Sequence, residues 1–301
     1  MIASLEHDCG YFRRASRLAV SLLPWRLPEE SRRIKGSLPI LTAVALYGSP
    51  KEAQASYEAW ALLYDAAEAF DSVQDGHVPP PLTPARAVNV GITLMFRATQ
   101  ILGRLPQTWQ DLAYLYLYET VEGQAEDVIK QRPTTQEALA IAEKKTGASF
   151  GLGCVLGALS AGASSEQIAA LDIYGRALGT MVQIHDDLEL IEGLGLAQPK
   201  PVERFSNVAL AYAWERLTPE LREAVVDHLA VFAANGEAER AVTAYEILVR
   251  SGARLFCAIE VAKRWQRGKQ ALDAAQLKPS LERDALYGLI DELVNTFKAP
   301  S

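Results

Sequence analysis

Apolar side chains recur at helical spacing along nearly the whole chain, and the alternation of Val, Ile and Thr that is typical of strands is nearly absent. Proline and glycine set several of the predicted helix ends, for example at Pro24, Gly48 and Gly76. The pattern predicts helices over residues 11–24, 37–49, 50–76, about 85–103, 107–130, 135–160, 165–193, 206–217, 218–234, about 236–268 and 278–298.

A proline-rich segment, HVPPPLTP at 77–84, is the strongest break in this pattern. The other connections are mostly short, and no linker rich in Gly, Ser or charge divides the chain. We therefore expect one all-α domain over residues 1–301, large enough to hold a deep apolar cavity between its helices. The uncharged run at 147–165 is rich in Gly, Ala and Ser, which favours a close-packed core helix and a turn over a transmembrane segment.

Composition and charge limit the classes of partner and the cellular compartment that we expect for this chain. Of the 301 residues 49 % are hydrophobic, which is ample for a core, and the net charge is −7. The densest basic clusters, at 31–35 and 262–269, are short, so no nucleic acid is expected as a partner. The first residues lack the apolar core of a signal peptide. The widely spaced Cys9, Cys154 and Cys257 form no disulfide framework or zinc motif, which fits a reducing cytoplasm.

Two acidic clusters are the candidates for chemistry. Asp71 and Asp75 are four residues apart, so both project from one helix face. Asp186 and Glu189 share a face of the helix predicted at 165–193, and Asp187 points about a quarter-turn away. Because Mg²⁺ takes carboxylates together with waters and phosphate oxygens, two such clusters would suit a diphosphate held through metal ions. Neither cluster is specific by itself, because each is also compatible with a solvated helix face.

Three further motifs, taken in their order along the chain, favour a metal–diphosphate site over a solvated helix face. They are EGQAEDV at 122–128, KKTGASF at 144–150 and LGTMVQIHDDLELIEG at 178–193. Together with the first acidic cluster they resemble the trans-isoprenyl diphosphate synthases, the polyprenyl synthetase family, over about residues 30–215. The resemblance implies the all-α isoprenoid synthase fold, in which two aspartate-rich helices face each other across a central cavity and bind a prenyl diphosphate through Mg²⁺. It also implies a homodimer.

The resemblance assigns roles residue by residue. Asp71 and Asp75 correspond to the first and last aspartates of the first motif, and Asp186 and Asp187 to the leading pair of the second. Lys145 corresponds to a diphosphate-binding lysine. Such positive charges stabilise the leaving diphosphate, while an apolar cavity protects the carbocation from water. The other positions expected at the substrate are Gln124, Asp127, Thr146, Gln183 and Lys200.

The chain also departs from the family's pattern. Ser72 stands where the first motif usually has its second aspartate. Leu190 replaces the last aspartate of the second motif, and either Glu189 or Glu192 is a candidate substitute as metal ligand. Tyr64 stands in the place of a histidine, and the arginine pair that usually follows the first motif is missing. In the family this histidine and the arginines belong to the binding of isopentenyl diphosphate.

A basic stretch near the N-terminus, SRRIKG at 31–36, keeps positive charge at Arg32, Arg33 and Lys35, where the family has G-K-R-x-R-P. Three hypotheses follow. We favour a Mg²⁺-dependent prenyltransferase that elongates allylic prenyl diphosphates. The second is a terpene-synthase-like enzyme that ionises a prenyl diphosphate and cyclises or hydrolyses it. The third is a non-catalytic partner subunit that binds prenyl diphosphate.

Overall fold

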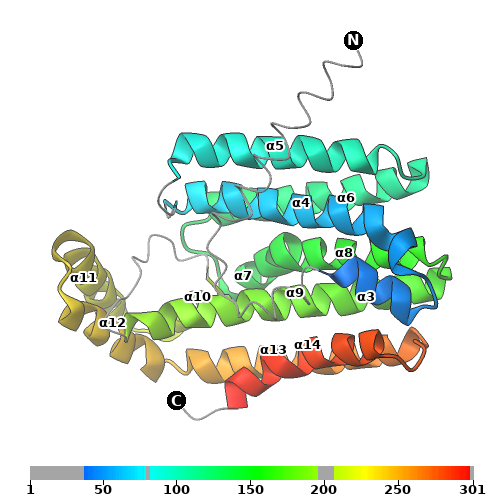
Figure 1. The fold of residues 1–301 in the computed structure, drawn as a ribbon. Coiled ribbons are helices and arrows are strands. Elements are labelled where there is room, and N and C mark those ends of the chain that lie inside the picture. The colour runs from blue at the N-terminus through cyan, green and yellow to red at the C-terminus, as the bar shows by residue number, and fades with distance from the viewer. Residues whose placement is uncertain (1–36, 77, 79–81, 196–206, 299–301) are drawn as a thin grey trace. The chain divides into compact units, whose positions relative to one another are not determined.

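The computed structural model describes residues 37–76, 78, 82–195 and 207–298. Within these ranges every regular element is a helix and no strand is present, so the predicted all-α class is confirmed (Figure 1). The helix predicted at 11–24 lies outside the described residues. The elements are α3 (Leu38–Ala45), α4 (Pro50–Gln74), α5 (Pro84–Leu102), α6 (Gln107–Ile129), α7 (Thr135–Ala142), the π-helix η1 (Glu143–Gly147), α8 (Ala148–Ser160), α9 (Ser165–Leu194), α10 (Val208–Arg216), α11 (Pro219–Asn235), α12 (Ala238–Arg250), α13 (Ala253–Ala274) and α14 (Leu281–Lys298).

The described residues group into two compact units, each of which is treated by itself. Unit 1 contains the described residues up to Tyr114, together with Leu152–Ile168 and Leu277–Ala285. Unit 2 contains Leu115–Gly151, Ala169–Gln276 and the described residues from Leu286 onward. The expectation of a single domain over 1–301 stays a prediction.

In unit 1, α4 and α5 run side by side, and the first aspartate-rich motif lies at the end of α4 (Figure 1). A capping box between Ser49 and Glu52 satisfies backbone donors at the start of α4. The Phe70 ring packs directly on Gly91 of α5, where a Cβ would lie only 2.7 Å from the ring. The absence of a side chain at Gly91 therefore lets the two helices approach at the end of α4, where Asp71 lies.

In unit 2, glycines bring α9 against the segment that carries the KTG motif. A Cβ at Gly179 would lie 2.4 Å from the backbone oxygen of Thr146, and one at Gly175 would lie 2.6 Å from that of Phe150. Real Cβ atoms do not approach that closely, so only glycine allows these contacts. The close approach holds the second aspartate-rich motif of α9 near the KTG motif of η1.

Two predicted helices differ in detail from the structure. The helix predicted at about 236–268 is divided into α12 and α13 by Ser251 and Gly252, and Gly252 has a left-handed φ of 83° that a continuing α-helix cannot contain. The helix predicted at 135–160 contains the π-helix η1. Periodicity did not reveal either change, because the apolar positions continue on both sides of each interruption.

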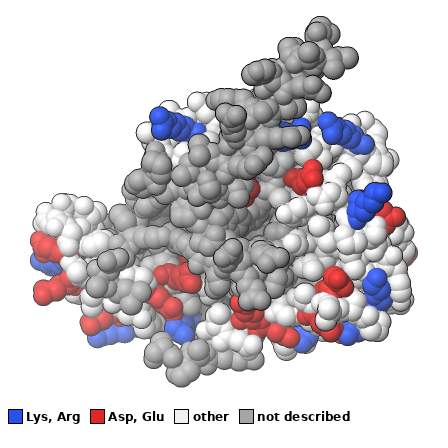
Figure 2. All heavy atoms as spheres, in the orientation of Figure 1, with Lys and Arg blue, Asp and Glu red and all other residues white. Residues whose placement is uncertain are grey.

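The uncharged run at 147–165 forms α8 and the turn that follows it, as predicted. Residues 148–158 of α8 are buried with the exception of Ser149. Among the helices described, none is long and apolar enough to cross a membrane. Charged side chains of both signs are interspersed over the described surface on the face drawn in Figure 2.

Candidate functional site

The first aspartate-rich motif lies at the end of α4 in unit 1. Asp71 is on its last turn, and the N–H of Asp75, the C-cap residue, donates to the carbonyl of Asp71 at 2.8 Å. Both aspartates are half-buried. The hydroxyl of Ser72 donates to the carbonyl of Ala69 at 2.9 Å, so it is directed back at its own helix and does not replace the missing carboxylate.

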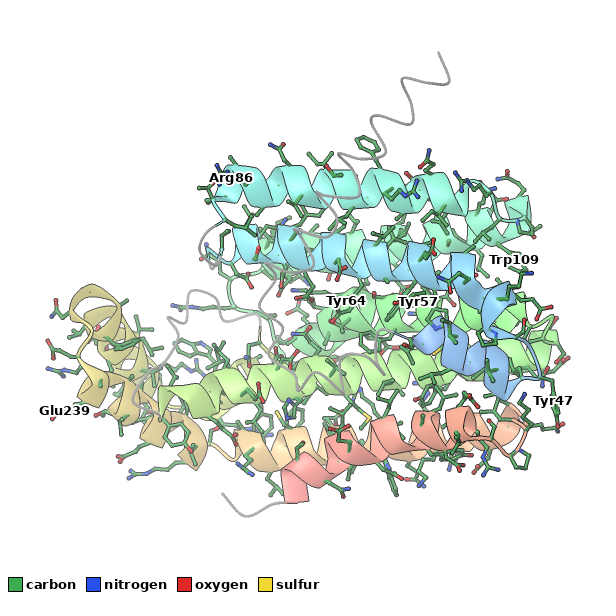
Figure 3. The ribbon with its side chains drawn as sticks, viewed as in Figure 1. Tyr47, Tyr57, Tyr64, Arg86, Trp109 and Glu239 are labelled. Atoms are coloured by element: carbon green, nitrogen blue, oxygen red, sulfur yellow. The ribbon has the colours of Figure 1, made fainter. Side chains whose placement is uncertain are left out.

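Aromatic rings line the same helix. Tyr64 lies two turns before Asp71 and therefore on nearly the same face of α4, and Tyr57 lies two turns before Tyr64 (Figure 3). The Tyr64 ring packs at a tilt against Trp60, with 5.6 Å between ring centroids. The phenol thus occupies the position of the family's histidine, without the charge that a histidine can carry.

Asp65, next to Tyr64, is a buried carboxyl that belongs to none of the sequence motifs. It is 8 % exposed and makes no hydrogen bond or ion pair with another described residue. Burial raises its pKa to about 6. A helical wheel of α4 could have revealed it, because Asp65 falls at the edge of the buried face.

In unit 2 the GQxxD and KTG motifs contact each other. Gly123 lies against the backbone of η1, where a Cβ would be 2.7 Å from the Lys145 nitrogen. Lys145 Nζ then forms an ion pair with Asp127 Oδ2 at 3.1 Å, and both side chains are mostly buried. Gln124 is half-buried beside Gly123 on α6. The predicted diphosphate lysine is therefore held by the aspartate of the GQxxD helix.

A chain of hydrogen bonds joins KTG to the second aspartate-rich motif. The hydroxyl of Thr146 donates to Gln183 Oε1 at 2.6 Å, and Gln183 Nε2 donates to Asp187 Oδ1 at 2.9 Å. The other carboxylate oxygen of Asp187 accepts the N–H of Val208 at 2.7 Å, at the start of α10. Three predicted substrate and metal residues thus form one network across η1, α9 and α10.

Asp187 is the most buried member of that network. Burial raises its pKa to about 7, although the hydrogen bonds from Val208 and Gln183 act in the opposite direction. Since both of its oxygens already accept hydrogen bonds, Asp187 acts in this structure as a fixed acceptor that joins α9 to α10. That Asp187 also binds a metal ion stays a prediction.

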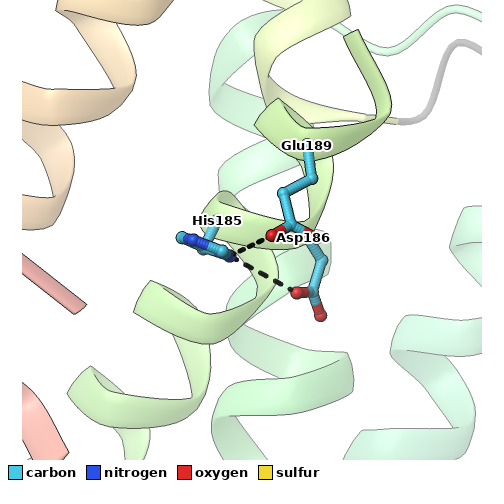
Figure 4. A group of neighbouring side chains, drawn as sticks. All are labelled: His185, Asp186 and Glu189. Atoms are coloured by element: carbon cyan, nitrogen blue, oxygen red, sulfur yellow. Dashed lines mark ion pairs between the residues drawn. The ribbon is translucent and has the colours of Figure 1, made fainter. Parts of the chain in front are cut away.

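Asp186 and Glu189 project from α9 to solvent, next to His185, as Figure 4 shows. One potential ligand atom from each of the three residues lies within 4.8 Å of the others. Glu192, the other candidate substitute for the missing carboxylate, instead forms an ion pair with Arg254 of α13. Between the two glutamates, the structure therefore favours Glu189 as the substitute.

How the remaining predicted positions lie relative to this network stays a prediction. The two aspartate-rich motifs belong to different units, so the expectation that they face each other stays a prediction. Four basic residues of the sequence prediction lie outside the described residues, namely Arg32, Arg33, Lys35 and Lys200.

Comparison with known proteins supplies the wider context for these motifs. A family model described as polyprenyl synthetase matches residues 82–202. A curated protein named short chain isoprenyl diphosphate synthase, from Methanothermobacter thermautotrophicus, is 28 % identical over 285 residues, which cover 86 % of this chain and 85 % of that protein.

Solved structures share the fold. A decaprenyl diphosphate synthase from Rhodobacter capsulatus superimposes with a TM-score of 0.73 at 18 % identity, covering 99 % of each chain. A polyprenyl synthase from Caulobacter crescentus, solved with calcium and isoprenyl diphosphate, gives a TM-score of 0.68 at 20 % identity, covering 97 % of this chain and 96 % of that one. These likenesses confirm the predicted isoprenoid synthase fold.

Proposed function

We propose that the chain is a prenyltransferase of isoprenoid biosynthesis, a member of the polyprenyl synthetase family of trans-isoprenyl diphosphate synthases, and that it extends an allylic prenyl diphosphate with isopentenyl diphosphate. The observation that carries the proposal is the network in unit 2, in which Lys145 pairs with Asp127 and Thr146 bonds Gln183. Three separate sequence motifs of the family meet there in hydrogen-bonding contact.

The reaction explains why these side chains are needed. The carbon–oxygen bond of the allylic diphosphate breaks, and diphosphate leaves with the electron pair. The double bond of isopentenyl diphosphate then attacks the allylic carbocation, and loss of a proton completes the product. Lys145 neutralises charge on the departing diphosphate, and the mostly buried position of the lysine side chain strengthens that interaction relative to open water.

The donor set fits a divalent metal ion, because Asp186 and Glu189 present exposed carboxylates on one face of α9. We propose Mg²⁺ as the metal, and Asp71 and Asp75 as further ligands needed for the same reaction. When bound, the metal ions would neutralise diphosphate oxygens and so lower the barrier to ionisation. The chain's own contribution is to hold Lys145, Asp186 and Glu189 on packed helices.

A second candidate function rests on the departures in the first motif. Ser72 bonds its own helix, and Tyr64 occupies the position of a histidine that in the family serves isopentenyl diphosphate. Loss of that second substrate would leave an enzyme that ionises a prenyl diphosphate and then cyclises or hydrolyses it. Aromatic faces such as those of Tyr64 and Trp60 stabilise cations, which agrees with such chemistry. A non-catalytic prenyl-diphosphate-binding subunit is the third possibility.

Product identification separates these functions. The purified chain is incubated with Mg²⁺ and geranyl, farnesyl or geranylgeranyl diphosphate, with and without isopentenyl diphosphate. We expect longer diphosphates only when isopentenyl diphosphate is present. Cyclic or alcohol products formed without it would support the second candidate. Binding of a prenyl diphosphate without turnover would support the third.

We also propose that the chain forms a homodimer through α6. Exposed apolar side chains follow one another at helical spacing on its unit 2 portion, and Tyr118 at their centre is 71 % exposed. Such a stripe on a helix is typical of a protein interface. The stripe comprises Leu115, Tyr118, Val121, Val128 and Ile129.

A cytoplasmic location is part of the proposal. Cys154 and Cys257 are buried and form no disulfide, which suits a reducing compartment.

A further inference from the structure

Asn207, the N-cap residue of α10, binds the turn of α9 that carries the second aspartate-rich motif. Its Nδ2 donates to the backbone carbonyl of Asp187 at 2.7 Å, and its Oδ1 accepts the N–H of Leu210 at 2.9 Å. The bond from Leu210 caps α10, as asparagine commonly does at this position. The bond to Asp187 has no such local purpose, because it joins residues 20 positions apart. Asn207 thus combines a helix cap with a contact to the motif.

The contact between α10 and Asp187 is buried. Asn207 is 7 % exposed and Asp187 is 8 % exposed. The N–H of Val208, the residue after Asn207, donates to Asp187 Oδ2 at 2.7 Å. The start of α10 therefore binds both the backbone and the carboxylate of Asp187. Because hydrogen bonds are strong where water is excluded, this double contact fixes the orientation of the carboxylate.

The fixed carboxylate determines the orientation of the next two side chains. Asp187 Oδ1 accepts a hydrogen bond from Gln183 Nε2, so the amide oxygen of Gln183 is turned to Thr146 and accepts its hydroxyl proton. An amide with its two ends exchanged would turn the oxygen of Gln183 towards an oxygen of Asp187. Thr146 directly follows Lys145 in η1. Three hydrogen bonds thus lead from Asn207 to the KTG motif.

The opposite end of α10 is bound to the helix that leads into η1. Glu215, next to the last residue of α10, accepts both the N–H and the hydroxyl of Thr135, at 2.8 and 2.7 Å. Thr135 begins α7, and α7 continues directly into η1. Since α10 contacts α9 at its start and α7 near its end, it helps to set the position of η1 relative to α9.

We propose that Asn207 is a positioning residue for the prenyl-transfer reaction, acting through Asp187 and Gln183. It holds Thr146, and with it the adjacent Lys145, in the orientation that meets the departing diphosphate. The inference rests on the proposed function, because it assigns a residue outside the sequence motifs to the site where the allylic diphosphate ionises. Placement matters there, since a displacement of about 1 Å at a reacting group can cost roughly 100-fold in rate.

Asn207→Ser separates the two roles of the side chain. Serine caps a helix about as well as asparagine, but it is too short to reach the carbonyl of Asp187. We expect kcat for elongation of farnesyl diphosphate to fall at least about tenfold, while KM changes less than about threefold. The unfolding temperature should stay nearly the same, because the cap is kept. A fall in kcat of less than about twofold would overturn the proposal.

Thr218→Ala is the matched control for helix capping. The Thr218 hydroxyl accepts the N–H of Leu221 at the start of α11, away from the hydrogen bonds that lead to the KTG motif. Its loss should lower the unfolding temperature by about 2–4 °C and leave kcat unchanged. Equal losses of kcat in Thr218→Ala and Asn207→Ser would show that helix stability alone explains both, and would overturn the proposal.

A double-mutant cycle tests whether the effect is transmitted to the KTG motif. Thr146→Val removes the hydroxyl at the far end of the network with little change of shape. In that variant, adding Asn207→Ser should lower kcat by less than about twofold, because the connection is already cut. If the two residues are unconnected, their separate effects on kcat multiply. That multiplied loss would overturn the proposal.

The same variants separate failure of this inference from failure of the proposed function. Elongated product that forms equally fast in Asn207→Ser would overturn the positioning role alone. Diphosphate release that needs no isopentenyl diphosphate, and that falls in Asn207→Ser, would overturn elongation and retain the positioning role. In a chain without turnover, NMR of the Gln183 side-chain amide reads the network directly. A resonance that shifts in Asn207→Ser but not in Thr218→Ala retains the network, and one that shifts in neither overturns it.

Discussion

At the residue scale, the ion pair of Lys145 and Asp127 is the contact closest to the proposed chemistry. Both side chains are mostly buried, so the pair attracts more strongly than a surface pair would. Without substrate, Asp127 balances the lysine's charge. When a diphosphate binds, Lys145 can also pair with the diphosphate oxygens. Because the lysine side chain is already mostly removed from water, this pairing requires little further desolvation of the ammonium group.

The first prediction concerns this lysine. Lys145→Ala should lower kcat/KM for the allylic diphosphate by about 100-fold or more, the effect expected for losing one group that stabilises a leaving anion. It should also reduce stability by roughly 2 kcal/mol, because Asp127 is left buried without its partner. The neighbouring Lys144→Ala removes a more exposed lysine that pairs with Glu126, and should change kcat/KM less than about threefold. Steady-state kinetics and urea unfolding measure both effects; equal losses in the two variants would contradict the assignment.

The second prediction concerns Asp65. Its folded pKa of about 6 lies above its ordinary value of 3.8, so the folded state favours the protonated carboxyl. Well below pH 3.8 the carboxyl is protonated in both states, and its ionisation increasingly disfavours the folded state as the pH rises from about 3.8 towards 6. Above that pH, Asp65→Asn should therefore increase the free energy of unfolding, on the order of 2–3 kcal/mol.

The same substitution at pH 4 should leave stability nearly unchanged. Asp227→Asn, at an exposed position of α11, serves as the control and should have little effect at either pH. An Asp65→Asn variant that is destabilised at pH 8 would show instead that the ionised carboxylate is needed in the folded state. Thermal unfolding followed at both pH values decides between these results.

At the element scale, the position of η1 against α9 depends on glycine. Gly179 allows the α9 backbone to approach the carbonyl of Thr146, and Thr146 in turn bonds Gln183 on α9. A π-helix inside a longer helix often accompanies a functional site, because the extra residue re-aims the neighbouring side chains. Here that segment contains both Lys145 and Thr146.

The third prediction follows from this packing. Gly179→Ala places a methyl group 2.4 Å from a backbone oxygen, which must move because it is not the end of a flexible side chain. We expect a loss of about 1–3 kcal/mol in stability and a clear loss of activity as η1 shifts. Gly193→Ala, on the same helix with open space around it, should be neutral or stabilising by about 0.5–1 kcal/mol. Similar behaviour of both variants would contradict the packing argument.

The helices themselves were largely predictable, because amphipathic spacing, caps and proline positions act locally. The start of α4 is an example, where Ser49, Pro50 and Glu52 specify the helix end within four residues. The division between α12 and α13 was not predicted, because Ser251 and Gly252 fall within an apolar pattern that continues on both sides of them. The π-helix could not be predicted from periodicity, because a single extra residue leaves the pattern on each side intact.

The site was predictable in part for a similar reason. Motif order identified Lys145, Thr146 and Gln183, and the structure brings their motifs into contact. The burial of Asp187 was not predicted, because its hydrogen bond to Val208 joins residues that are separated by a long stretch of chain. The position of His185 beside two carboxylates becomes visible only when the α9 side chains have coordinates.

At the scale of the whole molecule, the exposed stripe on α6 predicts assembly. Its large apolar side chains gain free energy when a partner removes them from water. In a monomer these exposed positions would contact only water, so polar side chains would suit them as well as apolar ones. A second copy of the chain is the partner that the family resemblance implies.

The fourth prediction tests that assembly. Tyr118→Glu should convert a dimer to a monomer, because it introduces a charge at the centre of the apolar stripe. Leu281→Glu, which changes an exposed leucine at the start of α14, should leave the mass unchanged. Light scattering coupled to size-exclusion chromatography measures both. A wild-type chain that is monomeric at micromolar concentration would contradict the dimer.

The activity proposed for the whole molecule depends on isopentenyl diphosphate being a substrate. The most direct measurement is incorporation of isotope-labelled isopentenyl diphosphate into product by the full chain, with farnesyl diphosphate and Mg²⁺, read by mass spectrometry. The proposed prenyltransferase predicts a longer allylic diphosphate that carries the label, and loss of that product in Lys145→Ala. Label that stays in unreacted isopentenyl diphosphate while farnesyl diphosphate becomes a cyclic product or an alcohol would contradict it.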